Sequence, residues 1–550
     1  MNGLESKANH GQKSAFLSGV LVLSISTVLV KIIGLACKIP LIAYLGAEGM
    51  GYFNSAYEIY ALLCVISTAG LPVALAMLIA TELARENRAR IDGIYRSACR
   101  MFCMLGGVGT LVLWLFAEPI AKAIGNADAK ACIVAIAPAL LAVCVASAVR
   151  GYFQGYGRMG PTAISQLIEA VGKLVFGVAF SAWAIRRGER LPVAAAYGVL
   201  GLTLGTVLSM LYLLIVKASD AHRMIHPRIR RVAGKGAVRM LLRIALPITV
   251  SAAVLGVTRM VDMALILRRL CDVGVSLPEA NRIYGAYTTL AVPVFSLIPA
   301  LVTPVALSLV PQLSAAIESR AGDGQVRVVS DALRLTVLLA MPSSLGIAVY
   351  ARPILSLLFA GEDEAIAIAA PLLSVLGASV FFSCLITTTN AILQSYRKTE
   401  KPIVSTVAGS AVKIVGAYAL IGIPSIGVFG APISTFLCNL TVSAMNLWYL
   451  YACLPHTKNL GIGRVFLRPF VASLCAIGLS MAVYFPVRSW ARSETVGFFA
   501  AVLTAVIGYA AFAVLLRAVT KEDLALLPCG RKNKRNNKKQ TVSEVSETHG

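Results

Sequence analysis

Apolar segments long enough to cross a membrane recur along almost the whole chain, and this recurrence leaves few folds open to it. A helix needs about 20 apolar residues to span the hydrocarbon core of a bilayer. The overlong segment 284–312 holds four prolines, so we expect one kinked helix there. The sequence therefore predicts an all-α polytopic membrane protein with fourteen transmembrane helices, at residues 15–36, 54–79, 98–118, 130–149, 162–185, 192–216, 244–267, 284–312, 332–351, 365–390, 403–422, 429–453, 465–485 and 496–516.

The composition agrees with a membrane protein. Hydrophobic residues make up 58% of the chain and charged residues 14%, which is too little charge for the surface of a soluble domain of 550 residues. Basic residues gather in alternate loops, such as 81–97 and 217–239, so the positive-inside rule places these loops and both termini in the cytoplasm. The net charge of +24 therefore indicates cytoplasmic loops and no nucleic-acid partner.

The two halves of the chain resemble each other. Matched positions lie 228 to 240 residues apart: Lys31 with Arg259, Tyr52 with Tyr284, Pro72 with Pro304, Gln154 with Gln394, and Lys173 with Lys413. Each half holds six predicted helices, and an even number gives both halves the same topology. Two duplicated lobes around a central cleft are typical of transporters, and a duplicated scaffold without a cleft is the alternative.

The repeat also predicts how the chain is divided. We expect a cytoplasmic lead at 1–14, an N-terminal six-helix lobe at 15–216, a basic linker at 217–239, a C-terminal six-helix lobe at 240–454, two added helices within 455–520 and a tail at 521–550. The basic run at 531–540 predicts that this tail is disordered. It is either attracted to anionic lipid head groups or a solvated stop signal.

Charged side chains inside the apolar segments form the candidate site. A cation at the centre of a membrane helix costs about 2.5–3.5 kcal/mol on insertion scales, so we expect it to face a hydrated cavity lined by protein. The spacing predicts ion pairs between Glu169 and Lys173, and between Arg259 and Asp262. Glu58 is expected to reach Lys31, and Lys413 has no acid in its own helix. The predicted substrate-binding cations are Lys31, Lys173, Arg259 and Lys413, and the supporting acids are Glu58, Glu169 and Asp262.

Four cations against three acids leave a surplus of positive charge in this site. Such a site suits an anion, above all a phosphate or diphosphate, which lysine binds as a point charge. The surplus argues against a cavity for cationic drugs. The alternative for each pair is a salt bridge that only fixes the packing of two helices.

Motifs for enzymatic chemistry are missing from the sequence. We find no GxxxxGK[ST] phosphate loop, no HExxH and no GxSxG, so the sequence predicts a transporter without a cofactor and not an enzyme. The 12 cysteines form no CxxC pair and only five histidines occur, which predicts no metal site. The energy source is left open between an ion gradient, the membrane potential and a substrate gradient.

Two stretches resemble a known family. KIIGLACKIPLIAYLGAEGMGYFNSAYEIYALLCVISTAGLPVALAMLIA at 31–80 and RGYFQGYGRMGPTAISQLIEAVGKL at 150–174 resemble the stage V sporulation protein B group. This group lies in the polysaccharide-transport branch of the multidrug/oligosaccharidyl-lipid/polysaccharide exporter superfamily, with the MurJ-type lipid II flippases. The resemblance covers about residues 14–520. It implies fourteen helices, two lobes, and flipping of an undecaprenyl-diphosphate-linked sugar, for this subgroup the peptidoglycan precursor lipid II, across the bacterial cell membrane.

The resemblance also implies roles for single residues. Lys31 falls where the family has a basic residue in helix 1 of the central cavity, and Arg259 at the corresponding position of helix 7. MurJ-type proteins tend to carry an Arg–Asp pair where this chain has Cys37 and Lys38, which favours the sporulation-type relatives. The implied role is cell-wall or spore-cortex synthesis, with wall-synthesis enzymes as partners. The rival hypotheses are a cation-coupled multidrug exporter and a non-transporting scaffold for wall synthesis.

Overall fold

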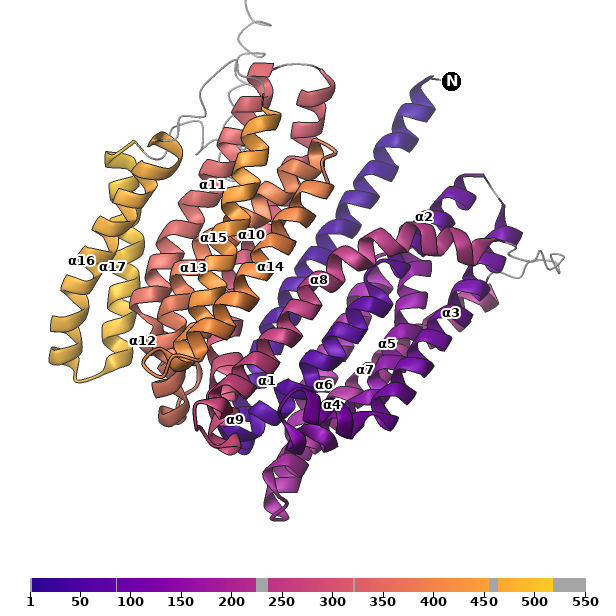
Figure 1. The fold of residues 1–550 in the computed structure, drawn as a ribbon. Helices are drawn as coiled ribbons and strands as arrows, with labels where there is room; N and C mark the ends of the chain where they lie inside the picture. Colours follow the sequence, from indigo (N-terminus) through magenta and orange to yellow (C-terminus); the bar gives the residue numbers. More distant parts are fainter. Residues whose placement is uncertain (1, 86, 224–235, 320–321, 455–462, 518–550) are drawn as a thin grey trace, which may run out of the picture.

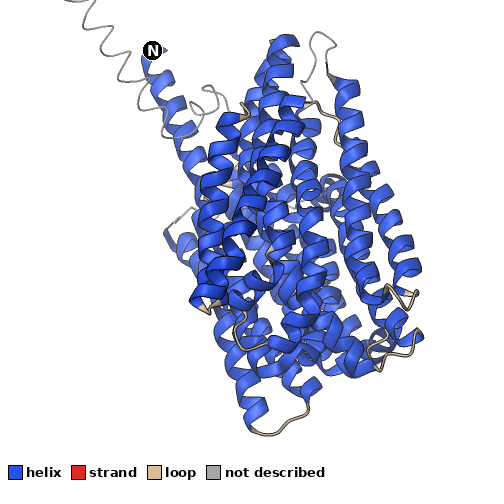
Figure 2. Ribbon diagram, turned by 90° about the vertical axis from the view of Figure 1, so that its left-hand side faces the viewer, coloured by secondary structure: helices blue, strands red, loops and turns tan. Residues whose placement is uncertain are grey.

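The computed structural model describes residues 2–517 apart from 86, 224–235, 320–321 and 455–462, and this described part is built from helices without a strand (Figure 2). The predicted tail at 521–550 and most of the predicted linker lie outside the described residues. The long helices are α1 (Asn2–Thr68), α2 (Leu71–Ala84), α3 (Arg88–Leu115), α5 (Lys130–Gly155), α6 (Gly160–Arg186), α7 (Leu191–Arg223), α8 (Ala237–Asp272), α10 (Val292–Glu318), α11 (Gly322–Val349), α13 (Asp363–Ser395), α14 (Glu400–Ile421), α15 (Gly430–Cys453), α16 (Arg468–Ala491) and α17 (Glu494–Leu515). The short helices are α4 (Ala117–Ala123), α9 (Leu277–Ala286), α12 (Ala351–Leu358), the 3-10 turns η1 (Ala127–Ala129) and η3 (Gly427–Phe429), and the π-helical turns η2 (Tyr287–Ala291) and η4 (Gly463–Leu467).

The all-α polytopic membrane fold is confirmed, but the count of fourteen spans is not. Thirteen candidate spans are found within the described residues, and the first, Val28–Ala84, holds 57 residues and overlaps two predicted spans. A straight helix of that length would be about 85 Å long, far more than the roughly 30 Å hydrocarbon core. The chain breaks it at Gly46, whose φ of 65° favours glycine, and again at Ala69 and Gly70. The loop expected between the first two spans is thus a kink.

The helices form two groups with α1 and α8 between them (Figure 1). The N-terminal group, α2 to α7, lies on one side, and the C-terminal group, α9 to α15, lies on the other. Helices α16 and α17 lie on the outer side of the C-terminal group, where they contact α11 and α12. Helix α1 contacts α8 and α9, so segments more than 200 residues apart meet in the middle of the molecule.

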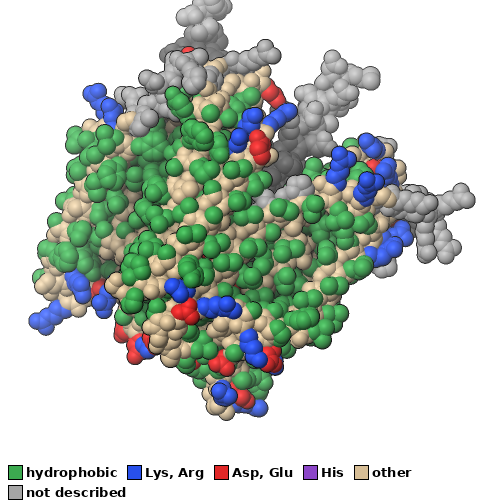
Figure 3. All heavy atoms as spheres, in the orientation of Figure 1, with side chains coloured by type: hydrophobic (Ala, Val, Ile, Leu, Met, Phe, Trp, Pro, Cys, Tyr) green, Lys and Arg blue, Asp and Glu red, His purple; other side chains and the backbone are tan. Residues whose placement is uncertain are grey.

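The surface agrees with a membrane environment. In Figure 3, hydrophobic side chains cover the middle of the face shown, while Lys, Arg, Asp and Glu side chains lie mostly toward its two ends. An exposed apolar band of this kind is expected for a protein solvated by lipid tails.

Two close contacts between a helix group and a central helix lie at opposite ends of the second half of α1. At the α9 contact, a Cβ on Gly285 would lie only 1.8 Å from the Ala47 carbonyl oxygen, and one on Gly51 would lie 2.4 Å from that of Asn281. At the α2 contact, a Cβ on Gly70 would lie 2.2 Å from the Ala245 carbonyl oxygen of α8. The helix between these contacts is about 30 Å long, which is the thickness of the hydrocarbon core.

Buried amides add to the α9 contact. Asn126 donates hydrogen bonds to the Asn281 side-chain oxygen at 2.7 Å and to the Ser55 hydroxyl at 3.0 Å, and all three residues are fully buried. Buried polar groups are costly unless they are paired, so these bonds hold the two groups together only in this arrangement.

Candidate functional site

The first cluster of predicted charges lies between α5 and α6. Lys173 Nζ is 2.7 Å from Glu169 Oε1, which confirms the predicted pair. Arg150 Nη2 of α5 is 3.0 Å from the other carboxylate oxygen and also donates to the Ser209 hydroxyl. Sequence reasoning missed Arg150 because the predicted helix ended at residue 149, whereas α5 continues to Gly155. Two cations therefore share one carboxylate.

Removing this carboxylate tests the cluster. Glu169→Gln is expected to lower the free energy of unfolding by about 3–5 kcal/mol, because Arg150 and Lys173 would remain largely buried without a counter-charge. Thermal unfolding of the purified protein in detergent measures the effect. The matched control is Glu189→Gln in the exposed loop after α6. Equal unfolding temperatures for the two variants would contradict this assignment.

The second cluster joins α8 to α14. Lys413 Nζ is 2.9 Å from Asp262 Oδ2, and both side chains are largely buried. The expected pair between Arg259 and Asp262 is therefore wrong, and Lys413, for which no acid was expected in its own helix, pairs with an acid on α8. Spacing on one helix places side chains on a common face but does not show which neighbouring helix offers a closer partner. Here Asp262 turns to α14, and its Oδ1 atom is buried without a partner.

The third cluster involves α8 and both halves of α1, before and after the kink at Gly46. Arg259 Nε is 4.0 Å from Glu58 Oε2, and the Arg259 side chain is 52% exposed. The expected pair between Glu58 and Lys31 is wrong, because Lys31 is exposed and makes no ion pair within the described part of the chain. Lys38 lies about two helical turns closer to the kink and interacts electrostatically with Glu58.

Lys38 also links the helix groups. Its Nζ donates a hydrogen bond of 2.7 Å to the Thr288 carbonyl of η2. The sequence showed Lys38 but gave no reason to count it as a site cation. Lys38 and Arg150 join the four predicted cations, so this set of site residues holds six cations against three acids, a larger surplus than the predicted four against three.

The repeat sorts the predicted cations into two kinds. Lys31 and Arg259, matched by the repeat, are both exposed on the helices between the groups. Lys173 and Lys413, also matched, are both held by a carboxylate at 2.7 and 2.9 Å. The two exposed cations are free to contact a ligand, while the two paired cations contribute mainly to helix packing and to the local field.

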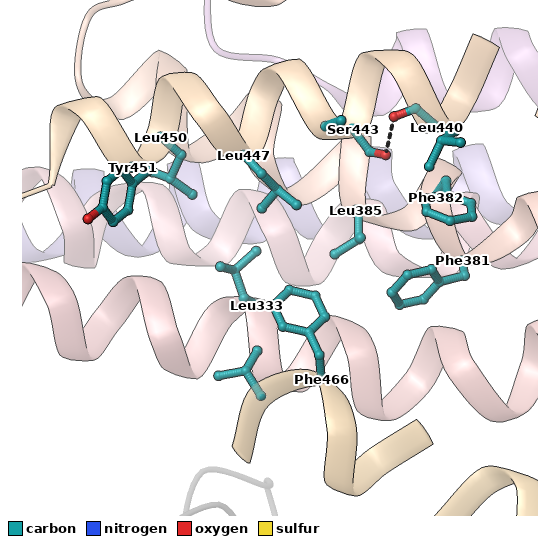
Figure 4. Close-up of a pocket in the computed structure, with 12 residues that line it drawn as sticks. Leu333, Phe381, Phe382, Leu385, Leu440, Ser443, Leu447, Leu450, Tyr451 and Phe466 are labelled. Atoms are coloured by element: carbon teal, nitrogen blue, oxygen red, sulfur yellow. Dashed lines mark hydrogen bonds between the residues drawn. The ribbon is translucent and has the colours of Figure 1, made fainter. Parts of the chain in front are cut away.

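An apolar pocket of about 440 Å³ lies in the C-terminal group (Figure 4). It is lined by α11, α13, α15 and η4, and Phe381, Phe382 and Phe466 contribute aromatic rings. Two of its lining residues, Ser443 and Tyr451, carry a hydroxyl, and that of Ser443 donates to the Leu440 carbonyl at 3.0 Å. The other lining residues are apolar, so the pocket offers a ligand mainly apolar contact.

Helical spans, two helix groups and intramembrane charges define a polytopic membrane protein with a transporter fold. The sequence matches the polysaccharide biosynthesis protein family over residues 16–317 and the MatE family over 286–419. The chain belongs to the polysaccharide biosynthesis protein family, since the match covers more than half of its length.

Relatives from Bacillus subtilis (strain 168) agree with this family. Stage V sporulation protein B is 23% identical over 525 residues, covering 94% of this chain and 98% of the relative. An uncharacterized membrane protein, YabM, is 26% identical over 434 residues, covering 78% of this chain and 79% of the relative. The lipid II flippase MurJ is 24% identical over 419 residues, covering 73% of this chain and 76% of the relative.

Solved structures show the same fold. A lipid II flippase MurJ in an inward closed conformation aligns with a TM-score of 0.69 at 16% identity, covering 90% of this chain and 99% of that one. An inward-facing MATE family multidrug resistance transporter of the MOP superfamily aligns with a TM-score of 0.61 at 16% identity, covering 79% of this chain and 98% of that one.

Proposed function

We propose that this protein is a flippase that moves an undecaprenyl-diphosphate-linked oligosaccharide, lipid II in particular, from the inner to the outer leaflet of a bacterial cell membrane. The observation that carries the proposal is the surplus of six cations over three acids in the set of site residues described above. A diphosphate is the anionic part of such a lipid, and charge-assisted hydrogen bonds to lysine and arginine are the strong kind. The names of the relatives, a lipid II flippase and a sporulation protein, support the same substrate class.

The exposed cations are the proposed contacts to the diphosphate. Lys31 and Arg259 lie on α1 and α8, the helices between the groups, and both residues are exposed. Lys173 and Lys413, each paired with a carboxylate, add to the positive electrostatic potential of the site. The apolar pocket between α11, α13 and α15 suits part of the polyprenyl chain, because burying hydrocarbon there costs no hydrogen bond.

The contact of α9 with α1 and the contact of α2 with α8 are the proposed gates. With the N-terminus in the cytoplasm, the α9 contact lies on the outer side of the membrane and the α2 contact on the inner side. Substrate would enter when the α2 contact opens and leave when the α9 contact opens. Alternating access needs two such closures, each made of surfaces that fit only when shut.

A second candidate, a cation-coupled multidrug exporter, is favoured by the MatE match and by the MATE-like fold. The surplus of positive charge disfavours it for cationic drugs, since like charges repel inside a site of low dielectric. Drug resistance on overexpression, without a cell-wall defect on deletion, would select this candidate.

Translocation of lipid II in cells tests the proposal. A strain depleted of its own lipid II flippases would express this chain, and an externally added toxin that cleaves lipid II would report the outer-leaflet pool. We expect this chain to restore cleavage, and an empty vector to leave lipid II uncleaved. Uncleaved lipid II despite normal expression would contradict lipid II as the substrate. The substrate would then be another polyprenyl-linked glycan, or the protein would be the multidrug exporter.

A further inference from the structure

The π-helical turn η2 leaves one carbonyl without its usual backbone partner. The Val292 N–H donates to the Tyr287 carbonyl five residues earlier, as in a π-helix. The next residue, Pro293, has no N–H to donate. The Thr288 carbonyl therefore loses both amides that could reach it, those four and five residues ahead. A partly buried carbonyl in this position is stabilised by a donor from elsewhere.

Side chains of α1 supply donors to this turn. Lys38 Nζ donates to the Thr288 carbonyl at 2.7 Å. Asn54, from the second half of α1, donates to the Thr288 and Thr289 hydroxyls at 3.0 and 2.8 Å. These bonds run between α1 and the C-terminal group, directly beside the α9 contact formed by α1 and α9.

The Lys38 charge is only loosely balanced. The acceptor of its hydrogen bond is a neutral carbonyl, and its acidic neighbour Glu58 also lies 4.0 Å from Arg259. An ammonium forms a stronger hydrogen bond with an anionic oxygen than with a neutral one. A diphosphate bound by Arg259 would therefore compete with the Thr288 carbonyl for Lys38.

We infer that Lys38 couples binding of the diphosphate to opening of the α9 contact. The inference rests on the proposed function. The anion takes the Lys38 ammonium away from the Thr288 carbonyl, which then lacks a donor. Water can replace the donor only when α1 and η2 separate, so the bound anion favours the open form of the α9 contact. Lys38 thus contacts the bound anion and acts on the α9 contact through η2.

The distance between the helix groups tests this inference. Cysteines at Glu189, exposed in the loop after α6, and at Asp363, the exposed first residue of α13, would carry spin labels in a chain whose native cysteines are replaced. The distance between the two labels would be measured by pulsed electron–electron double resonance in nanodiscs. The probes are undecaprenyl diphosphate, lipid II and the uncharged alcohol undecaprenol. We expect both diphosphate lipids, but not undecaprenol, to increase the fraction of molecules in which the two spin labels are far apart.

The variants isolate the role of Lys38. In Lys38→Met, the longer distances should already be populated without lipid, and undecaprenyl diphosphate should change them no further. Binding of undecaprenyl diphosphate, measured separately, should weaken by about tenfold, the worth of one charge-assisted hydrogen bond among several. Lys38→Arg should restore the response, and Lys122→Met, at an exposed surface pair on α4, should leave it unchanged.

The results that would contradict the inference can be told apart from those that would contradict the proposed function. A Lys38→Met protein that responds to undecaprenyl diphosphate as the unaltered chain does would overturn the inference and leave the proposed function standing. An unaltered chain that neither binds nor responds to the diphosphate lipids would overturn both. A purely structural role for Lys38 would lower the unfolding temperature of Lys38→Met while preserving its response to lipid, which also counts against the inference.

Discussion

Arg259→Ala is expected to reduce the rate of lipid II translocation by about a hundredfold, since a charged hydrogen-bond donor to the diphosphate is worth roughly 1.5–3 kcal/mol. Arg259 is the natural candidate for this loss because its side chain is 52% exposed and only loosely held by Glu58 at 4.0 Å. Its replacement therefore leaves no tightly buried partner behind. The effect should appear in transport with little change in the unfolding temperature.

The measurement is the initial rate of translocation in proteoliposomes that contain purified protein. Arg186→Ala is the matched control, because Arg186 is exposed in the last turn of α6, away from the helices between the groups. Arg259→Lys should retain part of the rate, since it keeps the charge but loses the two-pronged geometry. A rate for Arg259→Ala above half that of the control would show that the diphosphate does not depend on this cation.

Gly285→Leu is expected to stop translocation by preventing closure of the α9 contact. A Cβ at this position would lie 1.8 Å from the Ala47 carbonyl oxygen and 2.7 Å from the Gly51 nitrogen. Both neighbours are backbone atoms, so neither can move aside without separating the helices. The protein should therefore stay open at this end and fail to complete a transport cycle.

Labelling shows whether the contact is open. A cysteine at Asn281, fully buried in the closed contact, should react with a membrane-impermeant maleimide in Gly285→Leu and remain protected in the parent chain. Gly346→Leu is the control, since a Cβ at this helical position meets nothing within 4 Å. Gly70→Leu, at the opposite α2 contact, should stop transport while Asn281→Cys stays protected. Protection of Asn281→Cys in Gly285→Leu would contradict the assignment of the gate.

The sequence predicted the membrane fold and the residue types of the site, because these depend on local composition. Twenty apolar residues in a row fix a spanning helix wherever they pack. A lysine inside such a segment is visible without knowing its neighbours. Lys173 and Glu169 were paired correctly because they share one helix face at a spacing of four.

The remaining pairs depend on how helices cross, which local spacing does not contain. Asp262 has both Arg259 on its own helix and Lys413 on α14 within its surroundings, and tertiary packing brings Lys413 closer. Arg150 was missed because helix ends are uncertain by a turn. The role of η2 could have been suspected from Pro293, but the Lys38 that bonds to it is 250 residues away in sequence.

One measurement tests most directly that the surplus cations carry a diphosphate-linked glycan across the membrane. Purified protein in proteoliposomes would be given fluorescent lipid II, or the same glycan on an uncharged polyprenyl ether, and an impermeant quencher would report the fraction in each leaflet. We expect lipid II to cross at a rate that depends on the protein, and the uncharged analogue to cross no faster than in liposomes without protein. Equal rates for the two lipids, or no protein-dependent crossing of lipid II, would contradict the proposed function.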